Sequence, residues 1–253
     1  MNILIVNDDG IESDGIQILA ERLQKKHKVC VLAPDVNRSA VSHYITMFRP
    51  NTLKKYKENQ YCISGFPADC TCVGLESDLF GVKFDVVLSG INKGANLGTD
   101  IVYSGTCAGA RQAVFSRVPG IALSIDPIDY ERAEREGYKY KALADFVAKN
   151  LETLISLSKT DEPRMFVNVN GASVNKYKGV KFGKSLCVRQ YNDKFNVEEK
   201  DGVYISHFFP GRVCQDYGKE SDVQIVHDGY ICVNQIYADP VCNEVVDGIS
   251  FKL

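Results

Sequence analysis

The sequence lacks tryptophan altogether, and it has only three methionines and four histidines among its 253 residues. No apolar run approaches the length of a membrane span, and nothing near Met1 has the basic-then-apolar pattern of a signal peptide. The 30 basic and 32 acidic residues give a net charge of −2, so the electrostatic pattern of a nucleic-acid-binding protein is missing. We therefore expect a cytoplasmic protein that binds neither membranes nor nucleic-acid polymers.

Cysteine is present, but not in a pattern that builds a disulfide framework or a zinc site. There are nine cysteines, an odd number, and no C-x-x-C occurs. Cys70 and Cys72 form the only close pair, and no histidine lies near them at zinc-ligand spacing. We expect the cysteines to be small buried side chains, including Cys107 at the start of a predicted helix.

Short apolar runs alternate with helical patterns through the first two thirds of the chain. The runs predict buried strands at 3–6, 29–32, 85–89, 120–125 and 165–170, and a weaker extended pattern covers 44–64. Apolar spacing predicts helices from the first turn to about residue 26, and over about 68–80, 107–116 and 130–158. This alternation predicts an α/β fold, a Rossmann-like, doubly wound and mainly parallel sheet with helices on both faces.

From Lys176 onward the character of the sequence changes. Aromatic-rich, alternating runs at 202–209, 223–226 and 230–237 predict β-hairpins in place of βα units. We expect one α/β domain spanning 1–253, with 176–253 as a β-rich extension that makes subunit contacts.

Oxygen-bearing side chains follow three of the predicted strands. Asp8 and Asp9 end the first strand, Ser39 lies in the loop after the second, and Asn92 follows the strand at 85–89. Ligands of open α/β sheets bind beyond the carboxyl ends of the strands. Two carboxylates, a hydroxyl and an amide oxygen suit Mg²⁺ or Mn²⁺. The alternative for the acidic pair with Gly10 is an ordinary turn and helix N-cap.

A glycine-rich stretch, residues 92–106, leads directly into the small-residue helix at 107–116. Amides and hydroxyls at a helix N-terminus form an anion site, which favours a phosphate cradle here. The alternative is a flexible loop with a Ser/Thr cap. His43, the one histidine in a candidate site loop, would be either a proton donor to a leaving group or the partner in a structural hydrogen bond.

With these residues in view, the chain resembles the SurE family of stationary-phase survival proteins, which are metal-dependent 5′/3′-nucleotidases. The matching motifs run in the family's order along nearly the whole chain. They are 3–11 (ILIVNDDGI), 33–35 with 37–39 (APD, NRS), 89–92 with 94–98 (SGIN, GANLG) and 103–106 (YSGT). Phe66 departs from the pattern, because a small hydroxylated residue is common at that position.

The resemblance implies a phosphatase that hydrolyses nucleoside 5′-monophosphates, and often 3′-monophosphates and short polyphosphate. It implies one divalent cation, Mg²⁺ or Mn²⁺, per subunit and a homodimer or homotetramer built with the C-terminal extension. The family's metal ligands correspond to Asp8, Asp9, Ser39 and Asn92. Its phosphate-binding residues correspond to Asn96, Ser104, Gly105 and Thr106. Asp8 or Asp9 would also act as general base or nucleophile.

Two other classes of function fit part of the pattern. A non-enzymatic, Mg²⁺-binding switch of the receiver type also carries an acidic pair after its first strand, but it needs about half this length and no second anion loop. A nucleotide-binding module without hydrolysis would use the same loop. Repeated release of phosphate distinguishes the enzyme from both.

Overall fold

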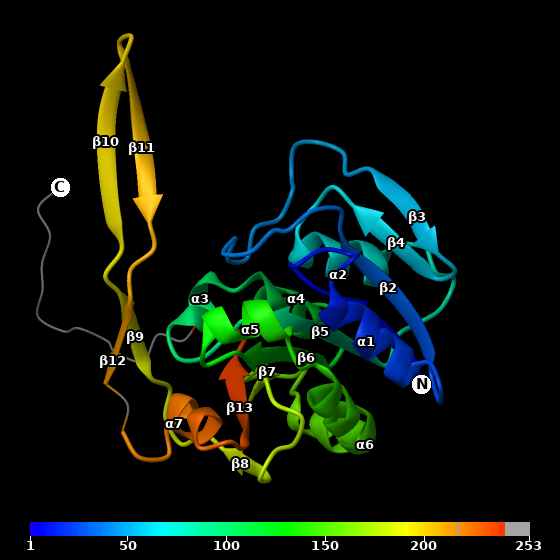
Figure 1. Ribbon diagram of the computed structural model, residues 1–253. Coiled ribbons are helices and arrows are strands. Elements are labelled where there is room, and N and C mark those ends of the chain that lie inside the picture. The colour runs from blue at the N-terminus through cyan, green and yellow to red at the C-terminus, as the bar shows by residue number, and fades with distance from the viewer. Residues whose placement is uncertain (217, 241–253) are drawn as a thin grey trace, which may run out of the picture.

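The computed structural model describes residues 1–216 and 218–240. Within these residues, nine strands form one sheet in the order β3-β4-β2-β1-β5-β6-β7-β13-β8 (Figure 1). Its strands are β1 (Asn2–Val6), β2 (Lys28–Pro34), β3 (Leu53–Lys57), β4 (Gln60–Ile63), β5 (Val86–Lys93), β6 (Gly120–Asp126), β7 (Met165–Ala172), β8 (Val180–Phe182) and β13 (Ile231–Tyr237). Among the described strand pairings of this nine-stranded sheet, only β3–β4 and β7–β13 are antiparallel. The predicted mainly parallel α/β sheet is therefore confirmed.

The central strands are buried on both faces, which explains their continuous apolar sequences. In β1, Ile3 and Ile5 pack into the core under one layer of helices, whereas Leu4 and Val6 pack under the other layer. The first layer contains α1 (Asp14–Leu23) and α6 (Lys141–Leu157), and the second contains α2 (Pro67–Glu76) and α4 (Gly105–Phe115). The parallel strands all point their carboxyl ends to one edge of the sheet, so the residues that follow them meet there.

Two sequence predictions about helices are wrong. The helix expected over 130–158 is divided into α5 (Tyr130–Glu136) and α6, because Gly137 ends α5 with a φ of +78°. The run at 223–226, expected to be a strand, belongs to the helix α7 (Asp222–His227). The Oγ atom of Ser221 accepts a hydrogen bond from the backbone N–H of Gln224 at 3.2 Å, which caps that helix.

The predicted C-terminal extension has two parts. The strands β8 and β13 join the edge of the main sheet, with β13 antiparallel to β7. Residues 188–216 instead form a long two-stranded arm that projects away from the sheet in Figure 1. The arm contains β9 (Val188–Tyr191) paired with β12 (Val213–Asp216), and β10 (Lys194–Lys200) paired with β11 (Val203–Phe209). Residues 241–253 of the predicted extension lie outside the described residues.

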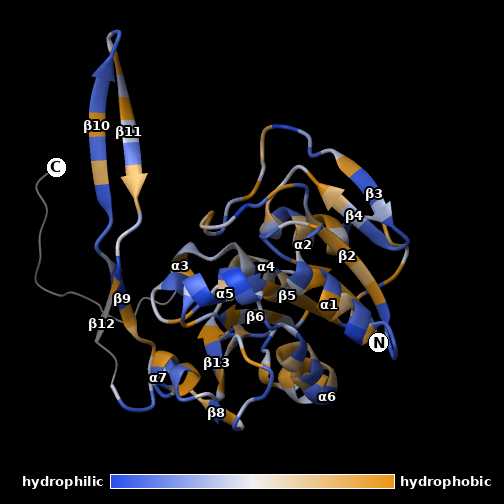
Figure 2. Ribbon diagram, viewed as in Figure 1, coloured by the Kyte–Doolittle hydropathy of each residue, from blue (hydrophilic) through white to orange (hydrophobic). Residues whose placement is uncertain are grey.

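The arm differs from the sheet in the exposure of its apolar side chains. The central strands of the sheet are buried, whereas the apolar (orange) positions of the arm in Figure 2 are exposed to solvent. Phe195 is 69% exposed and Phe208 is 56% exposed.

None of the helices in 1–216 and 218–240 combines the length and apolarity that a membrane span requires. No disulfide joins Cys30, Cys62, Cys70, Cys72, Cys107 or Cys232.

Candidate functional site at the carboxyl edge of the sheet

The chain turns sharply directly after β1, and this turn carries the acidic pair. Asn7 is buried, and its side-chain Nδ2 donates hydrogen bonds to Gly10 O at 2.9 Å and to Ser13 Oγ at 2.8 Å. Gly10 has a φ of +103°, a conformation that side-chain-bearing residues rarely adopt. Gly10 therefore permits the sharp turn, and the side chain of Asn7 stabilises it.

Asp8 points to the N-terminus of α4. The backbone N–H of Thr106 donates to Asp8 Oδ2 at 3.0 Å, and the Thr106 hydroxyl donates to Asp8 Oδ1 at 2.7 Å. A Cβ atom on Gly105 would lie 2.9 Å from Asp8 Oδ2, so only glycine permits this approach. The sheet therefore brings the predicted metal ligand Asp8 together with two predicted phosphate-binding residues.

The pKa of Asp8 is raised to about 7, mainly by burial and also by the charge of the neighbouring Asp9, while the hydrogen bonds from Thr106 act in the opposite direction. The pKa of Asp9 is raised as well, again mainly by burial. The backbone N–H of Lys93 donates to Asp9 Oδ2 at 2.8 Å, while the Lys93 ammonium group lies 2.9 Å from Glu134. Asp9 also lines a cavity of about 280 Å³. A buried carboxylate and a partly buried one, whose negative charges repel, favour a bound cation.

Asn92 and Ser39 each lie one residue from a backbone contact with this acidic pair, because Lys93 N–H donates to Asp9 Oδ2 and Arg38 N–H donates to Asp8 O. Asn92 lies on β5 and is 9% exposed, with its Nδ2 donating to Gly94 O at 2.9 Å. This bond leaves the amide oxygen as the atom available to a ligand. The backbone N–H of Arg38 donates to Asp8 O at 2.7 Å, which fixes the loop that carries the exposed Ser39. The strand predicted over 85–89 is longer than expected, because β5 continues to Lys93 across a shift in its register with β6.

The donor set fits a hard divalent cation better than zinc. Two carboxylates, an amide oxygen and a hydroxyl are oxygen donors of the kind that Mg²⁺ and Mn²⁺ prefer. Nowhere in the described part of the chain do three His, Cys, Asp or Glu side chains gather as a metal-binding group. A cation here would therefore depend on Asp8 and Asp9 together with neutral oxygens.

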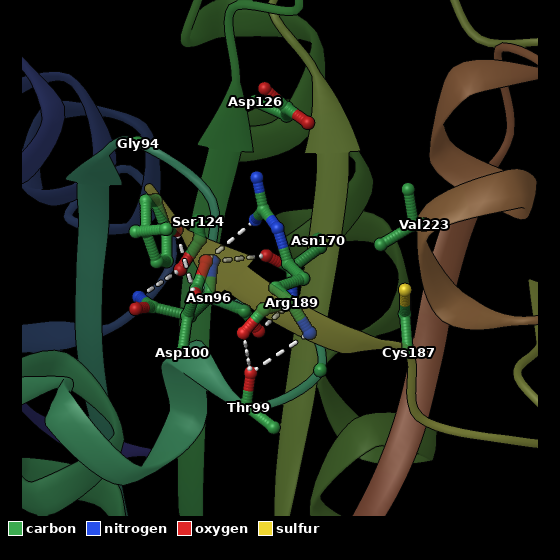
Figure 3. Close-up of polar contacts among 12 residues, drawn as sticks. Gly94, Asn96, Thr99, Asp100, Ser124, Asp126, Asn170, Cys187, Arg189 and Val223 are labelled. Carbon is green, nitrogen blue, oxygen red and sulfur yellow. Dashed lines mark hydrogen bonds and ion pairs between the residues drawn. The ribbon is translucent and has the colours of Figure 1, made fainter. Parts of the chain in front are cut away.

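Asn96 lies in a buried network that the sequence did not reveal (Figure 3). Its backbone N–H donates to Asn170 Oδ1 at 2.9 Å, and its Nδ2 donates to Ser124 Oγ at 2.7 Å. The Nδ2 atoms of Asn168 and Asn170 donate to Asn96 O at 2.8 and 3.1 Å. Polar residues at 168 and 170, inside an otherwise apolar run, are the only sequence signal for this support.

The next turn of the loop is held by residues from the C-terminal part of the chain. Gly98 N–H donates to Asp222 Oδ2 at 2.5 Å, and the Thr99 hydroxyl donates to Arg189 O at 2.7 Å. A guanidinium nitrogen of Arg189 lies 2.6 Å from a carboxylate oxygen of Asp100, in an ion pair that is nearly buried (Figure 3). The glycine-rich stretch is therefore not a free loop. Its contacts with Asp222 and Arg189 fix it directly before α3 (Asp100–Tyr103).

The hydroxyls predicted to bind phosphate already have local partners. Ser104 is the N-cap of α4, and its Oγ accepts a hydrogen bond from Cys107 N–H at 2.9 Å, while the Thr106 hydroxyl is bonded to Asp8. Burial raises the pKa of the Cys107 thiol to about 12, so this cysteine is no thiolate nucleophile. The N-terminus of α4 nevertheless presents its amide groups and the positive end of its dipole to the acidic turn.

His43 lies in the loop after β2 and packs against the C-terminal half of α4. Its Nε2 is 3.0 Å from Gln112 Oε1, and its ring stacks on Phe115 with 5.9 Å between the ring centroids. Burial lowers its pKa below the usual value. The structure thus shows the structural hydrogen bond that was one of the two alternatives, and the acid–base role of His43 stays a prediction.

Comparison with known proteins supports the same reading of the chain. The family described as Survival protein SurE matches residues 3–193. The protein is 37% identical to a 5′-nucleotidase SurE of Kosmotoga olearia over 245 residues, covering 94% of this chain and 92% of the relative. It is 38% identical to a 5′-nucleotidase SurE of Petrotoga mobilis over 242 residues, covering 93% and 92%. The crystal structure of a SurE protein from Aquifex aeolicus superposes with a TM-score of 0.78 at 30% identity and covers 95% of each chain. The chain belongs to the SurE family.

Proposed function

We propose that the protein is a divalent-cation-dependent phosphatase that hydrolyses nucleoside 5′-monophosphates to a nucleoside and phosphate. Nucleoside 3′-monophosphates and short polyphosphate are proposed as further substrates. The observation that carries the proposal is the contact between Asp8 and Thr106, at 2.7 and 3.0 Å. Through this contact, the carboxylates that suit a cation adjoin the helix N-terminus that suits a phosphate. The relatives named 5′-nucleotidase SurE support the choice of substrate.

In the proposed mechanism, Asp8, Asp9, Ser39 and Asn92 hold the cation, which when bound supplies positive charge that polarises a phosphoryl oxygen and the attacking water. The amides of Gly105 and Thr106, and the side chains of Asn96 and Ser104, orient the phosphoryl group and offset charge on its oxygens. Water adds to phosphorus as the P–O bond to the nucleoside breaks, and the nucleoside leaves as an alcohol.

Asp9 is the better placed of the two aspartates to accept the proton of the attacking water. Both carboxylate oxygens of Asp8 accept hydrogen bonds from Thr106, whereas the hydrogen bond from Lys93 occupies only Oδ2 of Asp9.

We also propose that the protein works as a homodimer or homotetramer. The support is the arm, residues 188–216, whose aromatic side chains are exposed in the single chain. Large exposed apolar surfaces are typical of protein–protein contacts.

The experiment is a phosphate-release assay on a panel of nucleoside 5′- and 3′-monophosphates and polyphosphate. The protein is first treated with EDTA, and then Mg²⁺, Mn²⁺ or Zn²⁺ is restored singly. We expect many turnovers per subunit with Mg²⁺ or Mn²⁺ and none with EDTA. Binding without turnover under Mn²⁺ would instead indicate a nucleotide-binding module, and a single stoichiometric phosphorylation would indicate a receiver-type switch.

A further inference from the structure

An aromatic cluster lies on the rim of the acidic site. The rings of Tyr44 and Phe66 have their centroids 4.5 Å apart and are tilted by 58°. The guanidinium carbon of Arg38 lies 5.2 Å from the centroid of the Phe66 ring. Tyr44 is 53% exposed and Phe66 is partly exposed, so the pair presents an aromatic surface to solvent. Isolated exposed aromatics need no explanation, but a packed and exposed pair beside a site does.

Two separate contacts place this cluster next to Asp8. Arg38 donates its backbone N–H to Asp8 O at 2.7 Å. Pro67, the residue after Phe66, also lies close to Asp8. A Cβ atom built on Gly105 would be 3.0 Å from Pro67 Cγ and 2.9 Å from Asp8 Oδ2, so both residues adjoin the same point of α4. A phosphate bound at Asp8 and the α4 N-terminus would therefore have Pro67 as a neighbour and Phe66 one residue farther out.

The segment that carries Tyr44 is fixed at both ends. On one side, Ser42 donates its N–H to Tyr103 O at 2.9 Å and its hydroxyl to Val102 O at 2.8 Å, just before α4. On the other side, Thr46 donates its N–H and hydroxyl to the carboxylate of Asp69 at 2.9 and 2.8 Å, in the first turn of α2. The segment 42–46, which carries Tyr44, is therefore hydrogen-bonded to α3 at one end and to α2 at the other.

We propose that Tyr44 and Phe66 form the platform against which the nucleobase stacks while the phosphate lies at Asp8 and the N-terminus of α4. This inference rests on the proposed nucleotidase function and adds to it the residues that select the base. Every nucleobase has a π-face that stacks on aromatic side chains, and purines offer the larger area. A phosphomonoester without a base gains nothing from such a surface.

Arg38 supports the platform and is not itself the phosphate ligand. Its terminal nitrogen Nη2 lies 3.4 Å from Asp35 Oδ1 and 3.3 Å from Ser64 O, both outside the acidic turn. Its guanidinium group is thereby held against the Phe66 ring, where a cation stabilises the aromatic face.

The test compares KM for AMP, CMP and ribose 5-phosphate in the wild type, Phe66→Ser, Phe66→Leu and Tyr44→Ala. Serine is favoured at a helix N-cap, and the N–H of residue 66 keeps its bond to Asp69 at 2.9 Å, so Phe66→Ser should fold. We expect KM for AMP to rise about tenfold in Phe66→Ser and in Tyr44→Ala, as loss of one base-stacking contact implies. The rise for CMP should be smaller. Neither kcat nor KM for ribose 5-phosphate should change.

Phe48→Ser is the matched control, because Phe48 belongs to the same loop, is 95% exposed and should not affect any of the three substrates. Phe66→Leu keeps apolar volume but removes the ring, so a wild-type KM for AMP in this variant would overturn the platform. An equal rise in KM for AMP and ribose 5-phosphate would also overturn it, since that result indicates a damaged phosphate site. If the wild type hydrolyses none of the three, the proposed function fails, and the ratio of AMP to ribose 5-phosphate affinity by titration calorimetry still decides the platform.

Discussion

The acidic turn after β1 and the arm at 188–216 distribute polar and apolar side chains in opposite ways. At the turn, Asp8 is 3% exposed, and both of its carboxylate oxygens accept hydrogen bonds from Thr106. In the arm, Phe195 and Phe208 face solvent with their ring centroids 5.4 Å apart. Burying a polar group is costly, and so is exposing an apolar surface. Each region therefore carries a cost in the single chain that a cation, in the first region, or a partner subunit, in the second, would remove.

The largest effect is expected at the turn. Asp8→Asn and Asp9→Asn should each lower kcat about a thousandfold or more, since each removes charge that holds the cation or accepts the proton. The measurement is phosphate release from AMP at saturating Mn²⁺, with circular dichroism to show that the variants fold. Glu12→Gln is the control, because Glu12 is an exposed carboxyl group in the same turn and should leave kcat unchanged. Full activity in both Asp variants would show that the site is elsewhere.

The second effect is on stability against pH, in protein kept free of metal by EDTA. The pKa of Asp8 is about 7 in the folded chain against 3.8 for an ordinary Asp, so the folded state favours the protonated form. The contribution of protonated Asp8 to the free energy of unfolding is complete below pH 3.8 and is lost as the pH rises through 7. It amounts to a decrease on the order of 4 kcal/mol in the free energy of unfolding. Asp9 acts in the same direction.

Urea unfolding between pH 4.5 and 8 measures this decrease, and Asp8→Asn should flatten it. Mg²⁺ or Mn²⁺ should restore stability most strongly above pH 7, where the carboxylate is charged and a cation offsets its burial. An unchanged pH dependence in Asp8→Asn would mean that other groups cause it. In that case the burial of Asp8 would not be the cost that distinguishes the acidic turn from the arm.

A smaller effect is expected where asparagine supports the site from behind. Asn170→Ala removes hydrogen bonds of 2.9 and 3.1 Å to the backbone of Asn96 and should lower the free energy of unfolding by about 1–3 kcal/mol. It should also raise KM for AMP, because Asn96 loses its position. Asn196→Ala, the same change at an exposed position in β10, should stay within about 0.5 kcal/mol of the wild type. Equal losses of stability in the two variants would remove the distinction between the regions.

The same contrast explains which features were predictable from the sequence. The strands β1, β2, β5, β6 and β7 lie where buried apolar runs predicted them, because burial on both faces leaves a continuous signal. Asp8 and Thr106 meet because both follow the carboxyl ends of neighbouring parallel strands. For these elements, local pattern and topology suffice.

Contacts between distant segments could not be predicted in this way. The carboxylate of Asp222 accepts a hydrogen bond from the N–H of Gly98, 124 residues away in the sequence, and neither local sequence indicates this partner. The sequence predicts a strand for the apolar residues of α7, because a six-residue helix is too short to show a helical period. Asn168 and Asn170 were placed on a strand correctly, but a strand pattern does not say what a buried amide bonds.

The arm should show the smallest effect on stability and the clearest effect on association. Phe195 and Phe208 are directly paired in the hairpin, so Phe195→Ser with Phe208→Ser removes one exposed aromatic face. The free energy of unfolding of the body and kcat should change little, within about 0.5 kcal/mol for stability, since neither ring packs on the sheet. Sedimentation velocity should show smaller assemblies than in the wild type. The paired change Asn196→Ser with His207→Ser, at the next position and on the opposite face, is the control. If the aromatic variant loses activity together with its assembly, the partner's arm contributes to the site, and the division between a catalytic edge and an associating arm does not hold.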